Sequence, residues 1–68
     1  MTMLKVIEVL AQSDKSWEDA AANAVRQASE SVRGIKSLYI KEMEATVVNG
    51  RITEYRINGK ISFVLGAS

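Results

Sequence analysis

The dipeptide Asn49-Gly50 lies between two long stretches rich in β-branched and aliphatic residues, and it constrains the fold more than any other feature of this chain. Asn-Gly supplies the two positive-φ residues of a tight hairpin turn, so an antiparallel strand is predicted on either side of it. A two-residue loop also predicts which residues of the two strands lie opposite each other: Val48 with Arg51, Glu44 with Tyr55, and Leu38 with Ile61.

The predicted register separates the hairpin into two faces, because side chains alternate along a strand and opposite residues share a side. One face is apolar and is expected to lie under a helix: Leu38, Ile40, Ile57, Ile61 and Phe63. The other face mixes polar and apolar side chains: Ser37, Tyr39, Lys41, Met43, Ala45, Val47, Ile52, Glu54, Arg56, Asn58 and Lys60. A β-bulge in either strand would exchange the two faces beyond it.

The first half of the chain predicts one strand and one helix. Residues 4–10 (LKVIEVL) are typical of a short strand, and residues 11–15 are interpreted as a polar connector. The segment Ser16-Trp17-Glu18-Asp19 predicts a helix start, with acidic residues at the positive end of the helix and Trp17 as a packing anchor. Gly34 is the predicted C-cap. Helical spacing predicts one stripe that faces the core: Trp17, Ala21, Ala24, Val25, Ala28 and Val32.

These elements predict a single α+β domain over residues 1–68 with the order β-α-β-β. The last strand fits between the other two, which gives a three-stranded antiparallel sheet of order 1-3-2 with a right-handed crossover. Strands of about 13 residues span more than 40 Å, whereas a helix of about 17 residues covers about 25 Å. Because an isolated two-stranded ribbon is barely stable in water, we expect the uncovered part of the hairpin to contact another copy of the chain.

The composition excludes several classes of function. Cysteine and histidine are absent, which excludes disulfides, ordinary structural zinc and histidine acid–base catalysis. The net charge is +1 and the charges alternate in sign, which argues against a nucleic-acid partner. No apolar stretch approaches the roughly 18 residues of a membrane span, and the first residues lack the pattern of a signal peptide. We therefore expect a non-enzymatic cytoplasmic protein without nucleic-acid or membrane partners.

Over essentially its whole length, the chain resembles the dodecins in the order and length of its elements. The segments that carry the resemblance are Val6 to Ser13, Ser16 to Ala21 with Ala24, Tyr55-Arg56-Ile57 and Ile61-Ser62-Phe63. The resemblance implies a hollow homododecamer with cubic-type symmetry. It also implies that flavins bind in pairs between aromatic residues at subunit interfaces, for storage or protection without catalysis.

The chain departs from the flavin-binding dodecins at the positions that hold the flavin. The family stacks the isoalloxazine ring on a tryptophan early in the second strand, and the matching residue here is Ser37. The family's flavin-binding glutamine falls at Arg56, its acidic residue for the ribityl chain at Glu42, and a basic residue of some relatives at Val64. Without the tryptophan, about 1 kcal/mol or more of stacking is lost. Tyr39 lies two residues after Ser37 and is the candidate replacement for this stacking group.

Two functions stay open at this point. The first is a homo-oligomeric shell that binds and sequesters a small ligand, riboflavin or FMN by resemblance. Its interface pocket would consist of four residues: Ser37, Tyr39, Glu42 and Arg56. Tyr39 would stack on the ligand, Arg56 would meet an anionic or carbonyl group, and Glu42 would meet hydroxyl groups or a cation.

The second function is a flavin-free shell, either structural or calcium-binding, as the resemblance implies for a branch of dodecins without the stacking tryptophan. Calcium prefers oxygen ligands such as carboxylates. Two groups of carboxylates could contribute: Glu42 with Glu44, and Asp14 with Glu18 and Asp19. The sequence leaves the metal ligands open, because the second group also suits a helix N-terminus and Glu44 also suits an ion pair between subunits.

Overall fold

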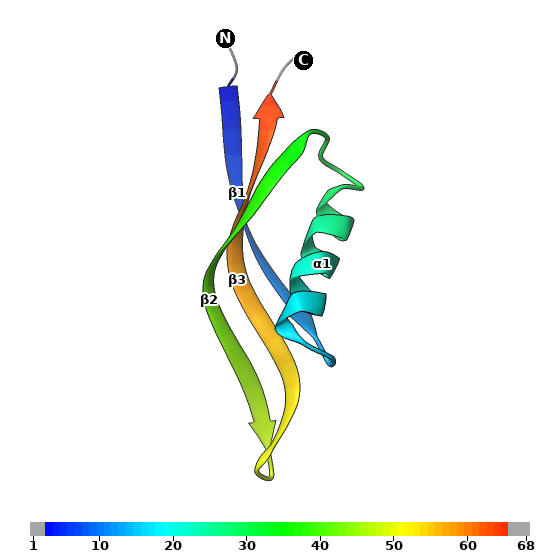
Figure 1. Cartoon of the computed structure of the whole chain (residues 1–68), viewed down its shortest axis with the longest axis vertical. Helices are drawn as coiled ribbons and strands as arrows, with labels where there is room; N and C mark the ends of the chain where they lie inside the picture. Colours follow the sequence, from blue (N-terminus) through cyan, green and yellow to red (C-terminus); the bar gives the residue numbers. More distant parts are fainter. Residues whose placement is uncertain (1–2, 66–68) are drawn as a thin grey trace.

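The computed structural model describes residues 3–65 and contains one helix and three strands (Figure 1). In chain order these elements are β1 (Met3–Ser13), α1 (Trp17–Ala28), β2 (Ile35–Val48) and β3 (Arg51–Leu65). The strands form one antiparallel sheet of order β1-β3-β2, with α1 along one side of it. The predicted β-α-β-β order and the 1-3-2 sheet are therefore confirmed. The helix of the described part is too short and too polar to cross a membrane.

Strand β1 is longer than predicted. The connector expected over residues 11–15 is wrong for its first three residues, because β1 continues to Ser13. Ala11, Gln12 and Ser13 pair with Ile57, Arg56 and Tyr55 of β3. Pairing with the central strand thus overrides the polar character of this segment, because each residue added to the sheet gains backbone hydrogen bonds.

Helix α1 begins where the sequence predicts and ends earlier. Ser16 is the N-cap, and its side-chain oxygen accepts a hydrogen bond from the Asp19 backbone N–H at 2.9 Å. The helix ends at Ala28, so the expected C-cap at Gly34 is wrong. The Ser29 hydroxyl donates to the Val25 carbonyl at 2.7 Å, a local bond of the kind that competes with helix continuation. Gly34 instead has a φ of +75° directly before β2.

The hairpin has the predicted turn and a shifted register in its middle. Asn49 and Gly50 have φ values of 52° and 76°, and Val48 pairs with Arg51 as predicted. Glu44, however, pairs with Arg56, so its predicted pairing with Tyr55 is wrong. Two β-bulges explain the difference: Thr53 of β3 and Lys41 of β2 each lack a partner. The bulges lie in opposite strands and offset each other, so the predicted pairing returns at Leu38 and Ile61.

The bulge at Lys41 changes the composition of the two sheet faces. Met43 and Ala45 lie opposite Ile57 and Tyr55, which share the side of α1, so their predicted place on the other face is wrong. Glu42 and Glu44 move to the face away from α1, which we call the open face. The open face also carries the following residues on paired positions: Val6, Glu8, Leu10 and Gln12 of β1, Ser37 and Tyr39 of β2, and Arg56, Asn58, Lys60 and Ser62 of β3.

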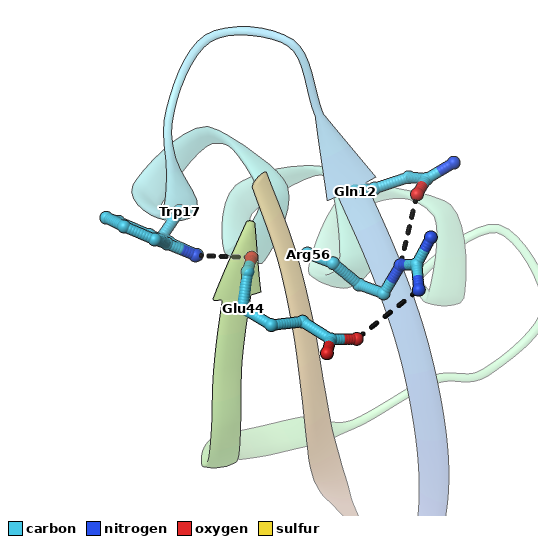
Figure 2. Close-up of polar contacts among 4 residues, drawn as sticks. All are labelled: Gln12, Trp17, Glu44 and Arg56. Carbon is cyan, nitrogen blue, oxygen red and sulfur yellow. Dashed lines mark hydrogen bonds and ion pairs between the residues drawn. The ribbon is translucent and has the colours of Figure 1, made fainter. Parts of the chain in front are cut away.

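The core between α1 and the sheet is small. Its buried apolar residues are Ala20, Ala24, Ile57 and Ile61. The predicted role of Trp17 as a packing anchor is confirmed, because its ring packs edge-to-face against Tyr55 with centroids 4.9 Å apart. The Trp17 indole N–H donates to the Glu44 carbonyl at 3.0 Å (Figure 2). Trp17 therefore attaches the start of α1 to the outer strand of the sheet.

Gly59 lies where β3 passes close to β2. A Cβ atom on Gly59 would lie 2.6 Å from the Tyr39 carbonyl oxygen and 3.2 Å from Cδ1 of Leu38. Real Cβ atoms do not approach a backbone oxygen at 2.6 Å, so the two strands would have to separate. Glycine is required here by the close approach of two backbones beside the Lys41 bulge.

We predict that Gly59→Ala lowers the free energy of unfolding by about 1–3 kcal/mol, the usual cost of forcing an extra carbon into a packed site. Denaturant unfolding at a matched protein concentration measures the change. Lys60→Ala is the control, because Lys60 is the next residue of β3 and is exposed; we expect a change within about 0.5 kcal/mol. Equal stability of the two variants would contradict the close approach.

Asp19 connects the end of β1 to the first turn of α1. Its Oδ2 accepts hydrogen bonds from the Ser13 hydroxyl at 2.6 Å and from the Asn23 amide at 3.3 Å. The hydrogen bond from Ser13 is the largest effect and lowers the pKa of the Asp19 carboxyl; burial opposes it with the next-largest effect, and Lys15, Asn23 and Arg26 lower the pKa further. The ionised form of Asp19 is therefore the form that the fold favours.

We predict that Asp19→Asn lowers the melting temperature at about pH 6 and that this difference disappears in acid. A carboxyl group whose pKa is lowered by folding stabilises the protein fully at pH values above its pKa in the unfolded chain, which is about 3.9 for aspartate. This stabilisation is lost as the pH falls through the lowered pKa of the folded state. Thermal melts of wild type and variant from pH 6 down to pH 2, read by circular dichroism, test this. Asp14→Asn is the control in the same loop. A difference that stays constant across this range would contradict the assignment.

The subunit is long for its size. It measures 52 × 20 × 13 Å, and its radius of gyration is 13.9 Å, whereas a compact domain of this length has about 11 Å. The pairing of β1 ends at Tyr55, so the hairpin tip of residues 46–54 extends beyond β1 (Figure 1). Val47, Val48 and Ile52 on this tip are half exposed.

Candidate functional site on the open face

The open face is the part of the molecule that gathers polar side chains from all three strands. Gln12 of β1, Arg56 of β3 and Glu44 of β2 form a row across the sheet, because Arg56 pairs with both of the others (Figure 2). Arg56 Nε donates to Gln12 Oε1 at 3.2 Å, and Arg56 Nη1 lies 3.3 Å from Glu44 Oε1. The guanidinium thus connects the two outer strands through the central one.

The ion pair between Arg56 and Glu44 is exposed to solvent. The side chains retain 42% and 65% of their accessible surface. Exposed pairs of this kind contribute at most about 1 kcal/mol, because water screens the attraction. The pair orients two charged groups on the open face more than it stabilises the fold. Arg56, a predicted site residue, therefore has an intrachain partner already.

The next row contains Leu10, Asn58 and Glu42. The side-chain oxygen of Asn58 is buried and has no hydrogen-bond partner among the described residues. Buried polar atoms are nearly always paired with protein or with ordered water, so this amide oxygen is available to water, a ligand or another subunit. Sequence reasoning placed Asn58 on this face and did not single it out, because its pairing with Glu42 depends on the Lys41 bulge.

Ser37 and Tyr39 lie at the other end of the open face. The hydroxyl groups of Ser37 and Ser62 are hydrogen-bonded to each other across the strands. Tyr39 lies opposite Lys60, and 64% of its surface is exposed. Ser37 is three rows from Arg56, which corresponds to about 20 Å along the strands.

The four predicted pocket residues therefore share one face without forming one pocket inside a subunit. Glu42 lies in the row next to Arg56, and Tyr39 lies in the row before Glu42. Ser37 and Arg56 do not meet within one chain. A ligand that touched both would have to span the face or lie between two subunits.

The second predicted group of carboxylates is arranged as a helix cap. Glu18 and Asp19 lie in the first turn of α1, and Asp19 accepts from Ser13 and Asn23. Lys15 and Arg26 line the same polar groove as Asp14 and Asp19, so cations of the chain itself lie among these acids. Within residues 3–65, no group of three or more histidine, cysteine, aspartate or glutamate side chains is arranged to hold a metal ion.

The fold is that of a small α+β subunit, with one helix on one side of a sheet and an open face of mixed polar and apolar side chains on the other. The family model described as Dodecin matches residues 3–66. The calcium dodecin of Mycobacterium tuberculosis is 42% identical over 64 residues, which cover 93% of this chain and 89% of the relative. The chain belongs to the dodecin family, whose members are non-enzymatic binding proteins.

Solved dodecin structures share the same fold. The Thermus thermophilus dodecin superposes with a TM-score of 0.92 at 22% identity and full coverage of both chains. The Streptomyces coelicolor dodecin has a TM-score of 0.91 at 24% identity, with 98% and 96% coverage. The crystal structure of the calcium-chelating antigen calcium dodecin from M. tuberculosis has a TM-score of 0.81 at 39% identity, with 97% and 94% coverage. The first two likenesses concern the fold alone.

Proposed function

We propose that this chain forms a homo-oligomeric dodecin shell of twelve subunits that binds Ca²⁺ on the open face. The observation that carries the proposal is the pairing of Glu42 with Asn58, whose amide oxygen is buried and has no partner among the described residues. The 42% identity to a protein named calcium dodecin supports the same ligand.

Self-assembly is supported by the surface that one subunit leaves exposed. The chain has an accessible surface of 5188 Å², whereas a compact monomer of its mass has about 4,200 Å². The excess of about 1,000 Å² is similar to the surface that one partner contributes to a standard protein interface. Much of it belongs to the hairpin tip and to the half-exposed apolar residues of β1. Further copies of the chain would cover these regions.

The chemistry of the Glu42 row suits a hard cation. A carboxylate and an amide oxygen are both calcium ligands, and calcium takes six to eight oxygens in total. Glu44 in the neighbouring row is held by Arg56, so of these two carboxylates Glu42 is the one that is left to meet a cation. Glu42 and Asn58 together offer at most three oxygens, which is too few, and we infer that a second subunit and water supply the others. This explains why one subunit holds no complete metal cluster within residues 3–65.

We predict that Glu42→Gln weakens calcium binding by the native assembly at least about tenfold, because it removes the charged ligand. Isothermal titration of the oligomer with CaCl₂ measures the affinity. Glu30→Gln is the matched control, since Glu30 follows α1 and is not on the sheet. Asn58→Leu is a second variant: it removes an oxygen that has no partner within the chain, so we expect weaker calcium binding with little loss of thermal stability.

Two results would contradict this proposal in different ways. An assembly that does not bind calcium at all would overturn the calcium function. Unchanged affinity in both Glu42→Gln and Asn58→Leu would leave calcium binding in place and show that the site lies elsewhere. Native mass spectrometry of the untreated protein gives the number of subunits and the mass of any bound ligand in one measurement.

Flavin is the second candidate ligand, favoured by the family and by Tyr39 as an exposed aromatic side chain on the open face. The surroundings fit flavin less well than calcium. Ser37, which matches the stacking position, is hydrogen-bonded to Ser62 and offers no flat surface. Arg56 is paired with Glu44 and Gln12, so it does not offer the free donor and acceptor edge of an amide.

We predict that Ser37→Trp raises the affinity for riboflavin by about fivefold to tenfold, because it restores about 1 kcal/mol or more of aromatic stacking. Titration followed by quenching of flavin fluorescence measures this. Thr46→Trp is the control, since it adds the same ring to the same strand at the far end of the sheet. An unchanged titration for Ser37→Trp would contradict the assignment of this position.

A further inference from the structure

Arg56 is the basic residue of the open face that holds a carboxylate of the same subunit. Its Nη1 lies 3.3 Å from Glu44 Oε1, and its Nε donates to Gln12 Oε1 at 3.2 Å (Figure 2). Within residues 3–65 this is the only ion pair, so Glu42 has no such partner there. One of the two carboxylates on this surface is thus neutralised by an arginine, and the other is not.

Glu42 and Glu44 are close enough to meet the same cation. They lie two residues apart on one side of β2, which separates their backbones by about 7 Å, and both side chains are long. Calcium takes six to eight oxygens, whereas Glu42 and Asn58 together offer at most three. Glu44 is the next carboxylate on this side of the strand and could add up to two more. Its ion pair with Arg56 opposes this use.

We propose that Arg56 is an internal competitor of calcium: it holds Glu44 until a cation is bound and then releases it to join Glu42. This inference rests on the calcium function proposed above and adds one ligand and one affinity-setting residue to that site. A guanidinium and a divalent cation repel each other and both bind carboxylate oxygens, so Glu44 does not serve both at full strength.

The exposed position of the pair makes the release easy. The Arg56 and Glu44 side chains retain 42% and 65% of their accessible surface, so water replaces the broken contact. Breaking an exposed pair of this kind changes an equilibrium by about fivefold at most. Gln12 lies on the opposite side of Arg56 from Glu44, so Nε of the released guanidinium keeps its partner (Figure 2).

The first test is the calcium affinity of the native assembly with Arg56→Gln, measured by isothermal titration with CaCl₂ at about 0.15 M salt. We expect the affinity to rise about tenfold. About fivefold comes from the end of the competition for Glu44. About twofold comes from the loss of a unit charge about 7 Å from the cation, because salt screens charges over a Debye length of about 8 Å.

Lys60→Gln is the matched control for charge. Lys60 lies on the open face two residues after Asn58 of β3, and Arg56 lies two residues before it. The two substitutions therefore remove the same charge at the same spacing from the Glu42 row. Lys60 differs in forming no ion pair within residues 3–65. We expect Lys60→Gln to raise the calcium affinity by only about twofold.

A double-mutant cycle with Glu44→Gln separates competition from simple repulsion between charges. If Arg56 acts by holding Glu44, Arg56→Gln has a smaller effect in the Glu44→Gln background, about the twofold effect of Lys60→Gln. If Arg56 acts only through its charge, its effect is the same in both backgrounds. We also expect Glu44→Gln alone to weaken calcium binding, since it removes a charged ligand.

Chemical labelling of the wild-type assembly follows the release without any variant. Phenylglyoxal modifies guanidinium groups, and mass spectrometry of the digested protein reads Arg56 and Arg51 separately. Arg51 is the internal reference, because it is exposed and forms no ion pair within the described chain. We expect calcium to raise the labelling rate of Arg56 by about twofold to fivefold, since a weak pair already leaves part of the population free, and to leave Arg51 unchanged.

The outcomes separate the competition from the calcium function itself. Tighter binding in Arg56→Gln than in Lys60→Gln, seen only when Glu44 is present, together with faster labelling of Arg56, supports the competition. Calcium binding that Glu42→Gln weakens, with equal effects of Arg56→Gln and Lys60→Gln or with unchanged labelling of Arg56, overturns the competition and leaves the proposed function standing. Failure of both the wild type and Arg56→Gln to bind calcium overturns both proposals.

Discussion

The central position of β3 is the constraint on which the rest of the structure depends. Arg51–Leu65 pairs with β1 on one side and β2 on the other, so every row of the sheet is defined by one β3 residue. From Tyr55 to Phe63, its odd-numbered residues, including buried Ile57 and Ile61, face α1. Its even-numbered residues, including Arg56 and Asn58, centre the rows of the open face. Because successive side chains of a strand point to opposite faces, the same register determines which residues form the core and which form the candidate site.

The bulges at Lys41 and Thr53 confine a register shift of the hairpin to a short segment. Between Lys41 and Thr53, β2 is shifted by one residue relative to β3, and the register of a simple hairpin returns from Ile40 to Ser37, before a further shift at Lys36. The shift moves Met43 toward the helix side and brings Glu42 and Glu44 onto the open face. A bulge thus converts a mixed surface into one with two carboxylates beside an arginine and an asparagine. Bulges often occur next to functional sites because they redirect side chains without altering the rest of the sheet.

The open face retains the geometry of a dodecin and changes its chemistry. At Ser37, the position that the resemblance assigns to the aromatic platform of the flavin-binding dodecins, two serine hydroxyls bond to each other. At the position that the resemblance assigns to the family's flavin-binding glutamine, Arg56 is held by Glu44 and Gln12. Hydroxyl, carboxylate and amide groups suit a hydrated cation better than a flat aromatic ring, because their contacts are polar and directional. The same small core that leaves this face open also leaves the edges of the sheet and the hairpin tip uncovered, so the proposed binding and the proposed assembly would use neighbouring surfaces of one sheet.

Much of the fold follows from the sequence, because local signals suffice for it. Asn49-Gly50 determined the hairpin, Ser16 with Asp19 determined the start of the helix, and the order of elements determined the 1-3-2 sheet. The length of β1 and the pairing of Glu44 were decided by the tertiary structure. Each depends on backbone bonds and packing contacts between distant residues, such as Gln12 with Arg56 or Gly59 with Tyr39. A bulge leaves no local signal in the sequence, since it arises where two strands fit against each other, and only the folded chain could place Glu42 beside Asn58.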